Sequence, residues 1–192
     1  MSRSFFIWAA ILGLVADLVP KLVVHGLFTC GAIGDGRELR LLGDVVKVTY
    51  AKNPHGLFSV DYGPPFIYFV LSLSAAALVA WFGLRARDWR SATAFGLILS
   101  GALGNVIDRI GLNYVIDFLL LDLPGTASVL SDRASDIPMA VFNLADVFVF
   151  AGAALLLGRE VAGRVSRPRA PRRAPGPAAL PEPSNPGTPG LY

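Results

Sequence analysis

Four long apolar stretches alternate with polar segments along the chain. They cover residues 5–24, 64–84, 91–107 and 137–158, and each contains few charged side chains or none. A helix needs about 20 mostly apolar residues to cross a hydrocarbon core of about 30 Å. The pattern therefore predicts an all-α membrane fold class with four transmembrane helices.

The segment between the first two apolar stretches has a different period. Its sequence alternates so that Val46, Val48 and Tyr50 share one face of an extended chain. An Asn-Pro-His-Gly sequence typical of a turn follows directly. We therefore expect a small extracytoplasmic β-sheet in the first outer loop, within residues 45–60, with Phe58 facing lipid or the acyl chains of a substrate.

The composition supports a membrane protein and excludes several other classes. Hydrophobic residues make up 54% of the 192 residues and charged ones 16%, whereas soluble domains average about 25% charged residues. The mean hydropathy is +0.56. Cys30 is the single cysteine, which excludes a disulfide-stabilised scaffold. The net charge of +3 comes largely from arginines at 159–173, so we expect no nucleic-acid partner.

Basic residues predict the orientation, because they concentrate on the cytoplasmic side of membrane proteins. They occur before the first apolar stretch, between the second and third, and after the fourth: Arg3; Arg85, Arg87 and Arg90; Arg159, Arg164, Arg167, Arg169, Arg172 and Arg173. The loops at 24–63 and 111–136 then lie outside. We expect a multi-pass protein with both termini in the cytoplasm.

The C-terminal segment differs from the rest of the chain. It is rich in Pro, Arg, Ala and Gly and has too few large apolar side chains to offset the entropy of ordering. We therefore divide the chain into a four-helix membrane domain at 1–163 and a disordered cytoplasmic tail at 164–192. The tail arginines are expected to contact anionic membrane lipid.

A cleaved secretory signal is an alternative interpretation of the N-terminus. Arg3, an apolar run, and Leu-Phe-Thr-Cys ending at Cys30 loosely match a lipoprotein signal. However, Asp17, Lys21 and His25 lie between the apolar run and that cysteine. An uncleaved first span fits the pattern better.

Polar residues recur inside the predicted spans at helical spacing. Ionisable groups there are costly and are functional candidates by default. In the predicted topology they gather near the outer leaflet on three helical faces: Asp17 with Lys21; Asn105 with Asp108 and Arg109; Asn143 with Asp146. A structural role as interhelical ties is the alternative for the Asp17–Lys21 and Asp108–Arg109 pairs.

Asp117 and Asp146 are harder to explain as structural ties, since neither has a basic partner within one helical turn. Two carboxyl groups that converge in a low-dielectric site tend to share one proton, which supplies one base and one acid. Such a pair suits amide hydrolysis by an activated water. We expect neither a metal nor another cofactor, because His25 and His55 are the only histidines.

Three segments resemble the signature of signal peptidase II, the bacterial lipoprotein signal peptidase. Residues 100–109 read Ser-Gly-Ala-Leu-Gly-Asn-Val-Ile-Asp-Arg, residues 115–118 read Val-Ile-Asp-Phe, and residues 141–146 read Val-Phe-Asn-Leu-Ala-Asp. The resemblance extends over about residues 5–158. It implies a catalytic pair, Asp117 and Asp146. It also implies substrate-binding residues, Asn53, Asn105, Arg109 and Asn143, and supporting residues, Asp17, Lys21, Asp108 and Phe58.

The resemblance also implies the substrate and the location. The family cleaves diacylglyceryl-modified prolipoproteins just before the lipidated cysteine, at the outer leaflet of the bacterial inner membrane. We further expect a monomer. Residues 54–57 and the long segment at 121–136 differ from the family's pattern, which leaves a divergent paralogue as an alternative. A small transporter or channel subunit and a non-enzymatic assembly factor are the rivals from other classes, although the chain has no internal repeat.

Overall fold

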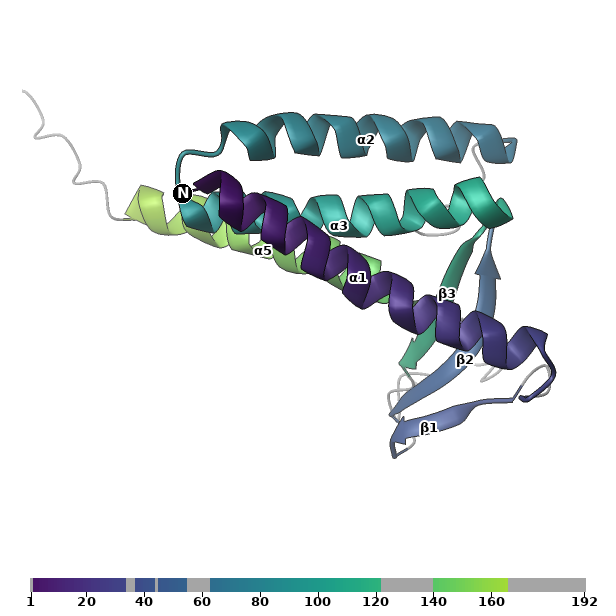
Figure 1. Cartoon of the computed structure of the whole chain (residues 1–192). Helices are drawn as coiled ribbons and strands as arrows, with labels where there is room; N and C mark the ends of the chain where they lie inside the picture. The colour runs from purple at the N-terminus through teal and green to yellow at the C-terminus, as the bar shows by residue number, and fades with distance from the viewer. Residues whose placement is uncertain (1, 34–36, 44, 55–62, 122–139, 166–192) are drawn as a thin grey trace, which may run out of the picture.

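The structure is a computed structural model, and it describes residues 2–33, 37–43, 45–54, 63–121 and 140–165. Its elements, in chain order, are α1 (Ser2–Thr29), β1 (Leu39–Leu42), β2 (Val46–Asn53), α2 (Pro65–Arg85), α3 (Trp89–Leu112), β3 (Val115–Leu121), β4 (Ala140–Phe142) and α5 (Leu144–Val165). The helices form an elongated bundle with the sheet at one end, beside the C-terminal part of α1 (Figure 1).

The bundle is organised around α3, which packs against α1, α2 and α5. Small residues allow these close approaches. A Cβ atom added at Gly96 would overlap the backbone of Phe6, and one added at Gly101 would overlap the carbonyl of Ala145. Glycine therefore lets α1 and α5 approach the α3 backbone, as small residues do in membrane helix packing.

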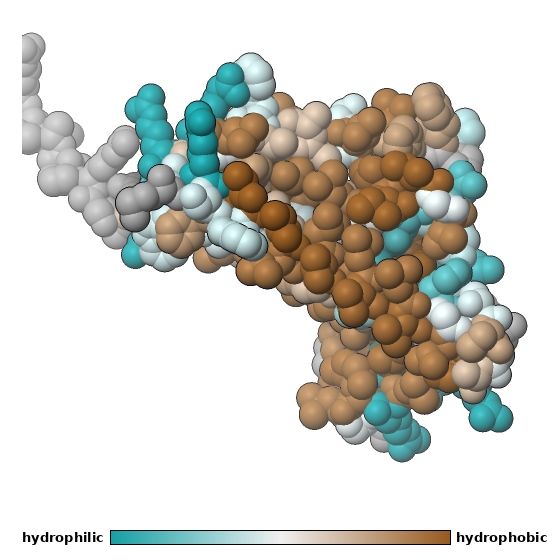
Figure 2. Space-filling model, in the orientation of Figure 1, coloured by the Kyte–Doolittle hydropathy of each residue, from teal (hydrophilic) through white to brown (hydrophobic). Residues whose placement is uncertain are grey.

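The outer surface of the bundle is apolar. Trp8, Leu22 and Phe66 are among many large apolar side chains that are mostly exposed. In Figure 2 such side chains cover the sides of the helices, and hydrophilic ones gather toward the ends. An apolar surface of this extent is expected when lipid, rather than water, surrounds the helices.

Three of the described helices, α1, α2 and α3, are long and apolar enough to cross a membrane. The helix α5 carries Asp146 in its first turn and Arg159 and Glu160 near its end, so its uncharged stretch covers only residues 147–158. The predicted count of four spans thus has support from three helices, and the fourth span stays a prediction.

The predicted start of the fourth apolar stretch was wrong. We expected a helix from residue 137, whereas Ala140–Phe142 form strand β4 and the helix begins at Leu144. Leu119 to Leu121 of β3 pair with these three residues in antiparallel register. The edge of β3 therefore supplies hydrogen-bonding partners for an extended backbone, and the helix begins only after this pairing ends.

The sheet was predicted in the first outer loop, and that location was only half right. The sheet has four strands in the order β1-β2-β3-β4; β3 comes from the second outer loop, and β4 comes from the start of the fourth apolar stretch. The strand β3 was missed because Val115–Leu121 is a nearly continuous apolar run without the alternation of a half-exposed strand. Its first four residues are buried, since α1 packs on the sheet through Val24, Phe28 and Phe118.

Candidate active site

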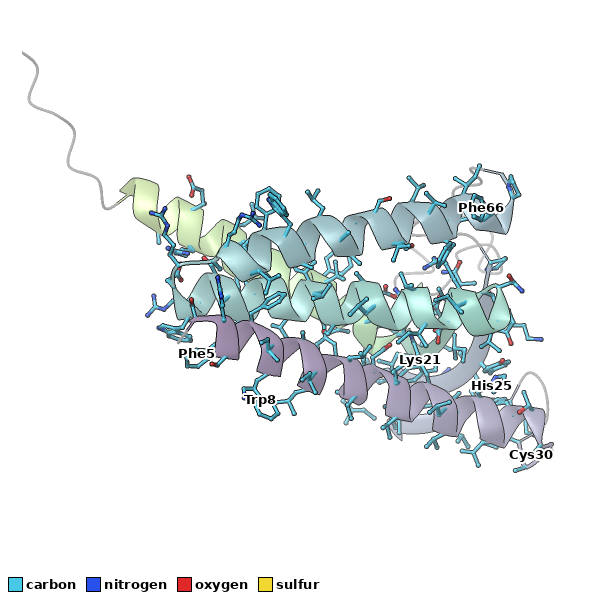
Figure 3. All side chains as sticks on the ribbon, turned by 45° about the horizontal axis from the view of Figure 1, so that its top comes forward. Phe5, Trp8, Lys21, His25, Cys30 and Phe66 are labelled. Atoms are coloured by element: carbon cyan, nitrogen blue, oxygen red, sulfur yellow. The ribbon has the colours of Figure 1, made fainter. Side chains whose placement is uncertain are left out.

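A buried lysine joins α1 to α3. The Lys21 ammonium lies 2.7 Å from Asp17 Oδ2 and 2.9 Å from Asp108 Oδ2, and it donates to Asn105 Oδ1 at 3.0 Å. Its side chain is 1% exposed (labelled in Figure 3). One of its three N–H donors thus has an amide acceptor, and two carboxylates lie at ion-pair distance. The arrangement compensates a charge that would otherwise be costly to bury.

The two pairs for which a structural role was the alternative form different contacts. The Asp17–Lys21 ion pair forms as its i,i+4 spacing predicted. Asp108 forms an ion pair with Lys21, and it accepts a hydrogen bond from the Ile116 backbone N–H at 3.1 Å. Adjacent residues on a helix do not face each other, so Lys21 on the neighbouring helix is the better placed cation.

Asp17 also reaches α5. Its Oδ1 accepts from the Ala145 backbone N–H at 2.8 Å, within the first turn of that helix. The carboxylate fits because residue 104 of α3 is glycine, where a Cβ atom would overlap Asp17 Oδ2. A negative charge near a helix N-terminus is favoured by the exposed N–H groups and the helix dipole. Asp17 therefore connects α1 to the start of α5 and packs against Gly104 of α3.

The orientation of the Asn105 amide follows from these contacts. Its Oδ1 faces Lys21, which can only donate hydrogen bonds, so its Nδ2 must point the other way. That Nδ2 donates to Asp146 Oδ1 at 3.2 Å. Asn105 thus links Lys21 on α1 to the carboxylate of Asp146 on α5.

Asn143 caps α5 and contacts both carboxylates of the predicted catalytic pair. Its side chain accepts from the Asp146 N–H at 3.1 Å, and its own N–H donates to Asp146 Oδ2 at 3.3 Å. This reciprocal pattern is a capping box. Its Nδ2 donates to Asp117 Oδ1 at 2.7 Å. A single side chain that is fully buried therefore links Asp117 on β3 to Asp146 on α5.

Asp117 lies on β3, where the sheet adjoins the helical bundle, and its side chain is 4% exposed. Its other oxygen, Oδ2, accepts from Asn53 Nδ2 at 2.9 Å, across the β2–β3 pair. Burial is the main reason that the pKa of Asp117 rises to about 6, and the nearby Asp146 carboxylate raises it further. The hydrogen bonds from Asn53 and Asn143 act in the opposite direction. The site therefore holds one carboxyl group close to its protonation point at neutral pH.

Two open cavities adjoin this cluster. One of about 260 Å³ is lined by Pro54, Phe66, Phe69, Arg109, Ile110 and Asn113. The other, of about 580 Å³, is lined by Phe142, Asp146, Val147, Phe150, Ala151 and Ala154. Arg109 donates to the Asn105 carbonyl at 3.3 Å and interacts electrostatically with Asp117 and Asp146. The larger cavity, whose lining is apolar apart from Asp146, can thus lead an extended ligand to that carboxylate.

A chain of three side chains that the sequence did not single out ties the sheet to α1. His25 Nδ1 lies 2.8 Å from the Tyr50 hydroxyl, and Tyr50 lies 2.9 Å from the Tyr114 hydroxyl. Burial and the hydrogen bond with Tyr114 raise the pKa of Tyr50 above its usual range. Alternation placed Tyr50 on the face of Val48, and both contact the Val24–Phe28–Phe118 cluster. No spacing in the sequence marks the partners of Tyr50.

The structure brings together nine of the ten predicted site residues. Phe58, together with residues 55–57 and the segment at 122–136, lies outside the described residues. Among the residues that are described, no group of three or more His, Cys, Asp or Glu side chains is arranged to hold a metal ion.

The chain matches known proteins over most of its length. The family model described as signal peptidase (SPase) II matches residues 9–161. A lipoprotein signal peptidase from Chlorobaculum tepidum is 34% identical over 160 residues, which cover 80% of this chain and 92% of that protein. One from Aeromonas hydrophila is 35% identical and covers 79% of this chain and 85% of its own length.

Two solved structures share the fold. Both are described as bacterial membrane enzymes determined by the in meso method. One, at 2.3 Å resolution, has a TM-score of 0.69 and 18% identity and covers 86% of this chain and 92% of its own. The other, at 1.9 Å, has a TM-score of 0.64 and 21% identity and covers 81% and 92%. The family match and the relatives above 30% identity confirm the resemblance in the motifs, and this chain belongs to the signal peptidase II family.

Proposed function

We propose that this protein is an aspartic endopeptidase of the bacterial inner membrane that removes the signal peptide from diacylglyceryl-modified prolipoproteins. The family match and the relatives named lipoprotein signal peptidase support the substrate class. We further propose that Asp117 and Asp146 are the catalytic pair and that the cleaved amide directly precedes the lipidated cysteine.

One observation carries the catalytic assignment. Asn143 donates one hydrogen bond to Asp117 through its side chain and another to Asp146 through its backbone. Two carboxyl groups held this way, at the junction of a sheet and a membrane bundle, can bind one water between them. The other buried carboxylates, Asp17 and Asp108, are compensated by Lys21. Among the residues that the structure describes in this cluster, Asp117 and Asp146 are therefore the carboxyl groups that form no ion pair with Lys21.

The surroundings suggest different roles for the two carboxyl groups. Asp146 lies in the first turn of α5, where the helix N-terminus favours a negative charge, so we assign it as the general base. Burial raises the pKa of Asp117 to about 6, so we assign it as the group that carries the shared proton.

The proposed reaction has two stages, and each of the two carboxyl groups transfers one proton in each stage. Asp146 takes a proton from the water as its oxygen attacks the carbonyl carbon, and Asp117 gives its proton to the carbonyl oxygen. When the C–N bond breaks, Asp146 returns its proton to the departing amine. Asp117 then recovers a proton from the hydroxyl that becomes the new carboxyl group. Both residues end in their starting states.

Asn53, Asn105, Arg109 and Asn143 are proposed to position the substrate. The Nδ2 of Asn53 has a second hydrogen that, like its Oδ1, can bind the peptide backbone. Arg109 lines the cavity next to Phe66 and Phe69, where a charged guanidinium can hold a polar group of the substrate. Asp17, Lys21, Asp108 and Phe58 are proposed as supporting residues.

We propose the topology of four spans, with both termini in the cytoplasm and the site at the outer leaflet. Arg3 and the two groups of arginines at 85–90 and 159–173 support this orientation, since each lies on the side opposite the sheet in a four-span arrangement. The substrate then enters laterally from the lipid. Within this proposal the enzyme acts as a monomer, and residues 164–192 are a cytoplasmic tail that catalysis does not require.

The test is cleavage of a diacylglyceryl-modified prolipoprotein by the purified full-length chain in detergent micelles. Asp117→Asn and Asp146→Asn should each lower turnover by about 10²–10⁴-fold, the usual contribution of a general acid or base. Asp88→Asn is the matched control, because asparagine caps a helix nearly as well as aspartate and Asp88 lies at the far end of α3. Near-normal turnover by either Asp117→Asn or Asp146→Asn, with the control active, would overturn the catalytic assignment.

A further inference from the structure

Two adjoining cavities lie at the end of the bundle farthest from the sheet. The first, of about 450 Å³, we call the headgroup cavity; it is lined by Ser2, Phe5, Arg87, Asp88 and Trp89. The second, of about 330 Å³, we call the acyl groove; it is lined by Ser4, Phe5, Trp8, Ala9 and Thr93. Phe5 lines both, and it is labelled with Trp8 near the start of α1 in Figure 3. They are separate from the active site, which lies at the opposite end of α1.

The headgroup cavity has an excess of positive charge. The one carboxylate that lines it, Asp88, accepts from the Ser91 N–H at 3.0 Å and forms an ion pair with Arg159. That hydrogen bond is the main reason that the pKa of Asp88 stays below its usual value. Asp88 is thus ionised and its charge is balanced by Arg159. Within the described part of the chain, Arg87 forms no ion pair, so its charge is available to a ligand.

The surroundings add further positive charge and an aromatic wall. Arg90 follows Trp89 in the first turn of α3. The guanidinium of Arg90 lies 5.3 Å from the centre of the Trp89 ring, and that ring lies 5.8 Å from Phe5. Arginine beside tryptophan is typical of the interface between lipid headgroups and acyl chains.

The acyl groove is apolar in contrast. Phe5, Trp8 and Ala9 come from α1, and Trp8 is 60% exposed. Thr93 of α3 donates its hydroxyl hydrogen to the Trp89 carbonyl of its own helix at 2.9 Å. Its polar group is therefore satisfied within the helix. Apart from Ser4, the other lining side chains are apolar and carry no charge, so the groove can hold a hydrocarbon chain beside Trp8.

We propose that the headgroup cavity and the acyl groove together bind one glycerophospholipid with an anionic headgroup. Its phosphate would lie at Arg87 and one acyl chain along Phe5 and Trp8. Basic pockets between membrane helices are known to select anionic headgroups. The lipid would fasten the start of α1 to the start of α3, far from the carboxylates that act on the substrate.

The test is native mass spectrometry of the detergent-purified full-length chain titrated with phosphatidylglycerol or with phosphatidylcholine of the same acyl chains. The wild-type chain should prefer phosphatidylglycerol. Arg87→Gln should weaken phosphatidylglycerol binding about fivefold, which corresponds to about 1 kcal/mol per basic residue at a lipid surface. Arg85→Gln is the matched control, since Arg85 lies 3.3 Å above the Trp81 ring and lines neither cavity.

Further variants separate the acyl chain from the phosphate. Trp8→Ala should weaken both lipids to a similar extent, whereas Trp81→Ala, which removes an exposed tryptophan of α2, should not. Glycerol 3-phosphate, which has the phosphate without the acyl chains, should not displace the lipid. Arg87→Lys keeps the charge and should retain most of the preference. Equal binding of the two lipids by the wild type, or equal losses with Arg85→Gln and Arg87→Gln, would overturn the proposal.

Discussion

Lys21 Nζ donates to Asn105 Oδ1 at 3.0 Å, and this bond fixes which end of the amide faces Asp146. Lys21 of α1 therefore orients Asn105 of α3, which in turn contacts Asp146 in the first turn of α5. The carboxylate of Asp146 is thus held by a side chain of α3 that Lys21 of α1 orients, and by the backbone N–H of Asn143 directly before α5. This arrangement preorganises the site before a substrate binds.

Replacing Lys21 should destabilise the protein strongly. Lys21→Met keeps the length of the side chain but leaves the buried Asp17 and Asp108 without a cation. Breaking a buried ion pair in this way costs about 3–5 kcal/mol. The free energy of unfolding in detergent micelles measures the effect. Adding Asp17→Asn to Lys21→Met should recover part of the loss, and additive losses in the double variant would show that the two charges are not coupled.

Two substitutions of Asn143 should separate its two roles. Asn143→Ala removes the cap of α5 and should cost about 1 kcal/mol of folding stability. Asn143→Ser restores a capping oxygen but has no N–H to donate to Asp117. Turnover of the lipidated substrate should fall in both variants, while thermal unfolding should remain near normal for serine only. Normal turnover by the serine variant would show that the Asn143–Asp117 contact is dispensable.

The raised pKa of Asp117 predicts how stability depends on pH. Burial raises this pKa from an ordinary 3.8 to about 6, so the folded state binds the proton more tightly than the unfolded state. The stabilisation from that proton is fully present below about pH 4 and is lost as the pH rises through 6. It amounts to roughly 3 kcal/mol. Unfolding free energies of the wild type, measured relative to Asp117→Asn, should therefore decrease from pH 4 to pH 7. A constant difference over this range would contradict the raised pKa.

The tyrosine chain should contribute to stability in a graded way. Tyr50→Phe removes the hydroxyl that contacts both His25 and Tyr114, whereas Tyr114→Phe removes one contact only. Lost hydrogen bonds of buried groups cost about 1–3 kcal/mol in total. Thermal unfolding should rank the wild type above Tyr114→Phe and Tyr114→Phe above Tyr50→Phe. The reverse order of the two variants would show that Tyr50 is not the centre of the chain.

Short-range spacing explains which parts of the site were predictable. The i,i+4 pair Asp17–Lys21 and the i,i+3 capping pair Asn143–Asp146 lie within one helical turn, so the sequence alone indicated their contacts. The match of Asp108 to Lys21 depends on how α1 and α3 pack, which no local spacing encodes. Residues 21 and 108 became neighbours through tertiary structure, so the spacing of Asp108 and Arg109 did not indicate this ion pair.

Local sequence patterns were also insufficient to predict the whole sheet. Alternation in the sequence predicted β2, whose residues are partly buried along nearly the whole strand. The strand β3 is buried at its first four residues and has no alternation, so its apolar run was taken as a link between helices. The strand β4 was absorbed into an apolar stretch that continues into α5. Apolar runs alone do not distinguish a buried strand from a helix.

Residues of the first outer loop should affect both the pKa of Asp117 and the affinity for the substrate. Asn53, at the end of β2, donates to Asp117 Oδ2, and this bond lowers the pKa of that carboxyl group. Removing it in Asn53→Ala should raise the pKa of Asp117, so this group should keep its proton to higher pH and the alkaline limb of the pH–rate profile should move to higher pH.

Phe58→Asp should instead weaken apparent affinity for the lipidated substrate without moving the profile, because an apolar contact with acyl chains has no influence on the proton. Leu41→Asp on the edge strand β1, whose side chain is 62% exposed, is the matched control. The measurement is turnover against pH for the three variants in the same micelles. If Asn53→Ala and Phe58→Asp both behave like the control, the loop is only a connection, and the helices alone must hold the substrate.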